Sequence, residues 1–175
     1  WCEPSVAPTN ATKSTQMAAN MVCAAAMQII LARLLCQGYS SVVTVNCGEG
    51  YIPTRFPDGL VDASSAIAWT TAEARMVERV AAFSNSGAVR TFVYGEAGNV
   101  PDQADLCILF AAPDSMADDL VRARDVLSRV RVREVCLALP READIPCILG
   151  ADWRLSLAGK LGSQYLPEAW RDYVL

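Results

Sequence analysis

The sequence predicts an α/β fold, a three-layer sandwich in which a mostly parallel sheet carries helices on both faces. After residue 38, short runs rich in β-branched residues alternate with amphipathic helical stretches, the order typical of strand–helix–strand units. Several of these runs are apolar without interruption, as expected for strands buried on both faces. The 175 residues contain no repeat and no long linker, so we expect one domain over residues 1–175, with residues 1–38 as a helical N-terminal extension.

The first expected element is a long apolar helix. Residues 17–36 contain neither glycine nor proline and are rich in good helix formers. Residues suited to helix capping place its start near Thr12 or Ser14, and Gly38 provides a glycine stop.

This helix has the length of a membrane span. Arg33, with Asn20 and Gln28, is costly inside a bilayer, so no membrane span is favoured. Its many small residues suit close packing, and we expect it to be buried or to join copies of the chain in a homo-oligomer or assembly through residues 13–36. The chain begins with Trp1 and not with methionine, so we expect a domain of a longer protein or a processed product.

Five strands and two further helices are expected after the glycine stop. The strand candidates are residues 41–46, 59–62, 89–93, 106–111 and 135–139. Thr70 and Glu73 form a capping box that starts a helix, and its apolar stripe, expected to face the core, consists of Ala72, Met76, Val80 and Phe83. Asp114 or Ser115 caps the last helix, whose apolar residues recur at spacings of three and four.

Composition excludes several classes of function. The formal net charge is −4 and the pI about 4.8, which excludes bulk electrostatic binding of nucleic acid. The chain contains no histidine. This excludes histidine-containing catalytic triads, acid–base catalysis by histidine and most zinc sites, so no metal is expected. The seven cysteines form no Cys-x-x-Cys pair, and we interpret them as small apolar residues of a protein in the cytoplasm or another reducing compartment.

Polar and glycine-containing segments follow the expected strands. Parallel α/β sheets bind ligands beyond the carboxyl ends of their strands, so these segments are the candidate site. A glycine turn at residues 47–50 follows the first strand, Asp62 ends the second, Glu96 follows the third and Asp114 the fourth. We expect Asp62 and Glu96 to lie at the same edge of the sheet.

In order and phase, these segments resemble the Rossmann-like class I S-adenosylmethionine-dependent methyltransferases. The resemblance covers residues 25–140 and is carried by VVTVNCGEG (42–50), GLVDAS (59–64), TFVYGEAGNVP (91–101) and ADLCILFAAPD (104–114). It implies methyl transfer with S-adenosylmethionine (SAM) as the cofactor. The positions that match cofactor-binding positions of the family are Asn46, Gly48, Gly50, Asp62, Glu96, Ala97 and Phe110.

The resemblance also implies a role for each position. The two glycines would face the methionine part of the cofactor, and Asp62 would hold the ribose hydroxyls. Glu96 and Ala97 would lie beside the adenine, and Phe110 or Ala111 would form the floor of the site. Catalysis would rest on proximity and orientation, with Asp114 as the candidate that orients or deprotonates the acceptor.

The sequence also departs from the family pattern. Thr44 stands where an acidic residue is usual, and Asn46 replaces a glycine. Residues 51–58 are too few for the usual helix and contain Pro53 and Pro57. These departures favour the alternative of a noncatalytic structural or interaction module, and enzyme activity is left open.

The sequence does not specify the methyl acceptor, and it is compatible with either a small molecule or an RNA. The arginines between Arg122 and Arg133 would either contact phosphates of an RNA or form a solvated helix surface balanced by neighbouring carboxylates.

Overall fold

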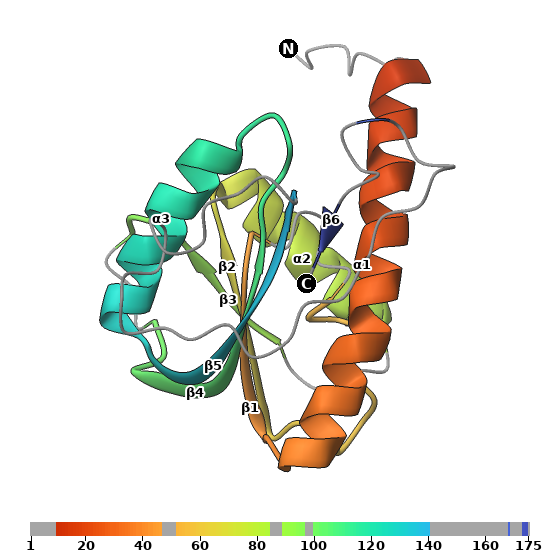
Figure 1. Cartoon of the computed structure of the whole chain (residues 1–175). Helices are drawn as coiled ribbons and strands as arrows, with labels where there is room; N and C mark the ends of the chain where they lie inside the picture. The colour runs from red at the N-terminus through yellow and green to blue at the C-terminus, as the bar shows by residue number, and fades with distance from the viewer. Residues whose placement is uncertain are drawn as a thin grey trace.

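The computed structural model describes residues 10–46, 52–84, 89–96 and 100–140, together with residue 168 and residues 173–174; for residues 10–16, 140 and 173–174 it describes the backbone only. The described elements, drawn in Figure 1, are α1 (Asn10–Gln37), β1 (Ser41–Val45), β2 (Ala63–Ala68), α2 (Thr71–Phe83), β3 (Val89–Val93), β4 (Gln103–Phe110), α3 (Met116–Arg129), β5 (Arg131–Pro140) and β6 (Tyr173–Val174).

The strands form one sheet in the order β3-β2-β1-β4-β5-β6. The pairs from β3 to β5 are all parallel, and β6 is antiparallel to β5. The chain therefore starts at the centre of the sheet with β1, builds outward through β2 and β3, and then crosses back to β4 and β5. The predicted α/β class with a mostly parallel sheet is confirmed.

Two apolar clusters hold helices on opposite faces of the sheet. Alternate residues of β1 point to opposite faces: Val42 packs with α1, and Val43 packs with α3. Figure 1 shows these two helices on either side of the strands. Val77 of α2 packs on Ala66, whose register partner on β1 is Thr44. Thr44 shares a face with Val42, so α2 lies on the same face as α1.

Helix α1 is both a core helix and an exposed one. Its inner side, including Val22 and Ile30, is fully buried in the cluster on β1 and β4. Its outer side exposes Met17, Met21 and Leu35, at 66%, 48% and 69%. Residues 17–37 are long and apolar enough to cross a membrane by length and composition, but the inner side packs as in a core helix. Gly38 ends the helix with φ +65, as predicted.

The second strand was predicted at the wrong place. Residues 59–62 are not a strand, and β2 runs over Ala63–Ala68. Leu60 and Val61 gave the strand-like signal, but they only pack partly buried against the α1 cluster. The true strand, ASSAIA, has weak strand propensity and is held by its position between β1 and β3.

Helix α2 also differs from its predicted orientation. The capping box of Thr70 and Glu73 is present, but the buried residues are Ala74 and Val77. Most of the expected core stripe is exposed instead: Phe83 is 92% exposed and Met76 39%, and only Val80 is partly buried. The strands beneath the helix carry small residues such as Ala66, and the side of α2 that contains Ala74 and Val77 packs on them.

Candidate functional site at the carboxyl edge of the sheet

Asn46 turns the chain at the carboxyl end of β1. Its backbone lies in the left-handed region at φ 55, where asparagine is tolerated better than most residues other than glycine. Its amide N–H donates to the carbonyl of Ile67 at 3.1 Å, and its side-chain Nδ2 donates to the carbonyl of Phe110 at 2.7 Å. Asn46 therefore ties together the carboxyl ends of β2, β1 and β4.

Trp69 follows the carboxyl end of β2 and is fixed there by a buried carboxylate. Its indole Nε1 donates to Oδ1 of Asp119 at 2.7 Å. Oδ2 of the same carboxylate accepts from the amide of Ala112 at 3.0 Å and from the hydroxyl of Ser115 at 2.8 Å. Asp119 is only 1% exposed, and it joins the ends of β2 and β4 to the start of α3.

Two further groups complete this corner of the edge. The ring of Tyr94, after β3, meets the Trp69 ring edge-to-face at 5.4 Å between centroids. The guanidinium of Arg122 lies over Trp69, 5.6 Å from the ring centroid. The indole is therefore held from two directions in addition to its hydrogen bond.

The turn after β3 contains a glycine with a positive φ. Gly95 has φ +83, and apart from its two chain neighbours no described residue has an atom within 4 Å of the position that a Cβ would take. Glu96 follows it, is exposed, and donates its backbone N–H to Val93 at 3.2 Å. Its carboxylate has no ion-pair or hydrogen-bond partner among the described residues, so it is available to a ligand at this edge.

The segment after β4 carries the other predicted residues. Phe110 is 7% exposed, and its side chain belongs to the cluster beneath α1, so its carbonyl, rather than its ring, reaches the edge. Asp114 lies exposed in the turn before α3. Ser115 occupies the N-cap position of α3 without a side-chain capping bond, and its hydroxyl donates to Asp119 instead.

Asp62 does not share an edge with Glu96, and this prediction was wrong. It precedes β2, and its N–H donates to Ser40, just before β1, at 2.7 Å. It therefore lies at the amino edge of the sheet, and the second-strand misplacement is the cause. Gly48, Gly50 and Ala97 lie outside the described residues.

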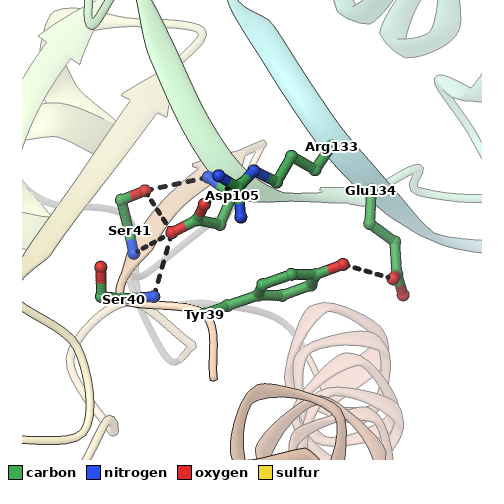
Figure 2. Close-up of polar contacts among 6 residues, drawn as sticks. All are labelled: Tyr39, Ser40, Ser41, Asp105, Arg133 and Glu134. Carbon is green, nitrogen blue, oxygen red and sulfur yellow. Dashed lines mark hydrogen bonds and ion pairs between the residues drawn. The ribbon is translucent and has the colours of Figure 1, made fainter. Parts of the chain in front are cut away.

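The amino edge holds a different polar network, shown in Figure 2. Oδ2 of Asp105, at the start of β4, accepts from the amides of Ser40 and Ser41 at 3.0 and 3.1 Å and from the Ser41 hydroxyl at 2.9 Å. Arg133 approaches the other oxygen at 3.4 Å. The backbone hydrogen bond from Ser40 is the main cause that lowers the pKa of Asp105. These bonds fix the start of β1, where α1 joins the sheet.

Helix α1 is docked to β5 by a second carboxylate in the same network. Arg33 donates Nε and Nη2 to the two oxygens of Glu134 at 2.7 and 2.9 Å, and the Tyr39 hydroxyl donates to it at 3.1 Å (Figure 2). The bond to Glu134 raises the pKa of Arg33, and burial raises the pKa of Tyr39. Around the starts of β1 and β4 and at residues 133–134 of β5, the described polar side chains are therefore engaged in structural contacts.

The residues around Trp69 were missed by the sequence analysis. Asp119 looks in the sequence like an ordinary acidic residue of a first helical turn, and its burial cannot be read from that pattern. Trp69 directly follows β2, and because β2 was placed too early, Trp69 was not recognised as an edge residue.

Neither a family model nor a curated protein matches the sequence. Solved structures do match. The methyltransferase domain of bacterial CtHen1 superposes with TM-score 0.56 at 12% identity, over 68% of this chain and 67% of that chain. Magnesium protoporphyrin IX methyltransferase (ChlM) from Synechocystis PCC 6803 with bound SAM superposes with TM-score 0.60 at 13% identity, over 97% and 83%.

The chain has the class I methyltransferase fold. ChlM with bound S-adenosylhomocysteine (SAH) also matches, with TM-score 0.52 at 9% identity, over 79% of this chain and 64% of that chain. At these identities the similarity concerns the fold. The order β3-β2-β1-β4-β5 and the helix that precedes β1 agree with the resemblance seen in the sequence.

Proposed function

We propose that this domain binds SAM at the carboxyl edge of its sheet and transfers the methyl group to an acceptor. The observation that carries the proposal is the edge itself: Asn46 makes a fixed left-handed turn at the end of β1, and after β3 the exposed Glu96 carboxylate has no partner among the described residues. The structural neighbour ChlM, which has the same fold, was solved with bound SAM. The free thiols of Cys107 and Cys136 agree with a reducing compartment such as the cytoplasm.

The described residues suit the cofactor at the end of β3 and depart from the family pattern at the end of β2. Glu96 offers a carboxylate without a partner among the described residues, and this suits ribose hydroxyls or an adenine amino group because a carboxylate is a strong acceptor. At the end of β2, however, Trp69 is the first residue of the edge. The nearby Glu73 carboxylate is engaged with the amides of Trp69 and Thr70 at 2.8 and 3.1 Å. We therefore assign ribose recognition to Glu96 and not to the end of β2.

Bound SAM supplies an activated methyl group on a sulfonium sulfur. The chain's own contribution is orientation. Asn46 fixes the end of β1 through its hydrogen bonds to Ile67 and Phe110, and Asp119 fixes the segment after β4 against Trp69. That segment includes the exposed Asp114, and in this proposal its carboxylate accepts a proton from the acceptor or orients it.

The test is calorimetric titration with SAM and SAH. Glu96→Ala is expected to weaken SAH binding by about 10-fold or more, since it removes a charge-assisted hydrogen bond. Asp62→Ala is the matched control, because it removes an exposed carboxylate at the opposite edge and should leave the affinity unchanged. Loss of affinity in Asp62→Ala but not in Glu96→Ala would overturn the assignment.

A second candidate is a noncatalytic module with the same fold. Trp69, held by Asp119, fills the end of β2 with an indole, and residues 46–62 connect β1 to β2 with no helix among the described residues. No binding heat and no thermal shift at millimolar SAM and SAH, from a chain that melts cooperatively, would reject the enzyme and support this candidate.

A further inference from the structure

Most of the apolar stripe of α2 is exposed, and only Val80 is partly buried. Ala72, Met76, Val80 and Phe83 recur at helical spacing, yet the helix packs on the sheet through Ala74 and Val77. Phe83, in the last turn, is 92% exposed. An aromatic ring left in water at that fraction, within a regular apolar stripe, is typical of an interaction surface.

An open groove lies directly beside Phe83. Residues 54–58 form one wall, and Val80, Phe83 and Ser84 form the other, around a volume of about 570 Å³. Helix α2 begins after the carboxyl end of β2 and ends before the amino end of β3, so its last turn lies toward the amino edge. The groove is therefore separate from the proposed cofactor site.

We propose that this surface binds a second copy of the chain about a two-fold axis, with Phe83 of each copy seated in the groove of the other. A projecting ring and an adjacent hollow on the same surface are self-complementary, as an isologous interface requires. The groove is within the volume range of pockets that hold whole small ligands, so it has room for one phenyl ring.

Charge on this surface supports the same occupant. Asp58 stands on the groove wall, and Arg79 lies one helical turn before Phe83; both are exposed, and neither has an ion pair among the described residues. Seating Phe83 in the partner's groove brings Arg79 of one copy toward Asp58 of the other. A second copy therefore meets opposite charges at the rim.

The size of the proposed interface indicates how tightly the dimer should associate. Stable interfaces bury about 800 Å² per partner, and α2 with 13 residues is only about 20 Å long. Even with residues 54–58 the area is at the lower end of that class. We therefore expect a reversible, concentration-dependent dimer.

The test is sedimentation velocity of the full chain from micromolar to millimolar concentration. Phe83→Asp is expected to weaken dimerisation by about 100-fold, because the two-fold axis counts the change twice. In a dimer of one wild-type and one Phe83→Asp chain, only the wild-type Phe83 can enter the groove of its partner. This mixed dimer should associate about 10-fold more weakly than the wild-type dimer. Val121→Asp is the control, since Val121 is an apolar residue 71% exposed on α3, on the opposite face, and it should dimerise normally.

A variant of α1 makes the experiment decisive. Met21→Asp changes the outer side of α1, where the sequence suggested assembly through residues 13–36, and on our proposal it leaves the dimer intact. Dimerisation lost in Met21→Asp but kept in Phe83→Asp would overturn the proposal, as would a wild-type chain that stays monomeric. Open-ended oligomers would exclude the two-fold arrangement. The SAH titration of Phe83→Asp should match wild type, so this proposal and the proposed function fail independently.

Discussion

Replacing Asp119 by alanine tests whether one buried carboxylate holds the carboxyl edge together. The change removes the acceptor of three hydrogen bonds, from Trp69, Ala112 and Ser115. The Ser115 hydroxyl is exposed enough to bond to water. The indole and the Ala112 amide are partly buried and would lose their partner.

The expected cost follows from these two donors. A hydrogen bond to a charged group contributes about 1.5–3 kcal/mol, and part of the loss is offset because the charge no longer has to be buried. We expect Asp119→Ala to lower the free energy of unfolding by about 3–4 kcal/mol, and the Tm of a chain of this size by about 10 °C. Asp119→Asn keeps one acceptor oxygen and should lose about half as much.

Urea unfolding and calorimetry measure the effect. Asp118→Ala is the control, because it removes the neighbouring, exposed carboxylate of the same helical turn and should change stability by less than about 0.5 kcal/mol. Trp69→Phe combined with Asp119→Ala should cost less than the two changes separately, since both remove the same bond. A loss below about 1 kcal/mol in Asp119→Ala, or full additivity with Trp69→Phe, would refute the reasoning.

Three further predictions concern the amino edge and the thiols. Arg33→Ala breaks the bidentate ion pair that docks α1 on β5 and should lower the free energy of unfolding in urea by about 1 kcal/mol. Arg129→Ala removes an exposed ion pair within α3 and should lower it by almost nothing. Equal losses in the two variants would contradict this. The pKa of Asp105 is lowered by folding, so its contribution to stability is present above the pKa of the unfolded carboxyl and is lost as the pH falls through the folded pKa. The stability difference between wild type and Asp105→Asn should therefore shrink below about pH 4, and a difference independent of pH would be inconsistent. Burial raises the pKa of the Cys107 thiol to about 12, so iodoacetamide at neutral pH should label the exposed Cys36 and leave Cys107 unmodified until the chain unfolds.

The elements that the sequence predicted well are those whose signal is local. The capping box of Thr70 and Glu73 marked the start of α2, and Gly38 marked the end of α1, because both signals depend on adjacent residues. Strand β2 was missed since its identity is set by neighbours across the sheet. The direction of the α2 stripe was missed for a related reason: periodicity reveals an apolar side but not whether the strands beneath it accept that side.

The candidate site was predicted in part. The position of Glu96 after the third strand is confirmed, because the strand itself was placed at its observed bounds. The edge position of Asp62 was wrong because one misplaced strand moved it to the other end of the sheet. The contact between Trp69 and Asp119 joins residues 50 positions apart, and nothing in a single sequence specifies that pairing.

The central position of β1 has a consequence for the order in which the chain folds. Its neighbour β4 is remote in the sequence, and Ser41 and Asp105, which bond across this seam, are 64 residues apart. Closing so large a loop costs conformational entropy before the contacts between β1 and β4, the seam, are formed. The half that contains β1 to β3 and the half that contains β4 and β5 can therefore each gain structure through local contacts before they join. We expect the seam to form late and, once formed, to give the slowest-exchanging amides of the molecule. A chain nicked between β3 and β4 would expose two complementary strand edges, each of which only the other half can cover.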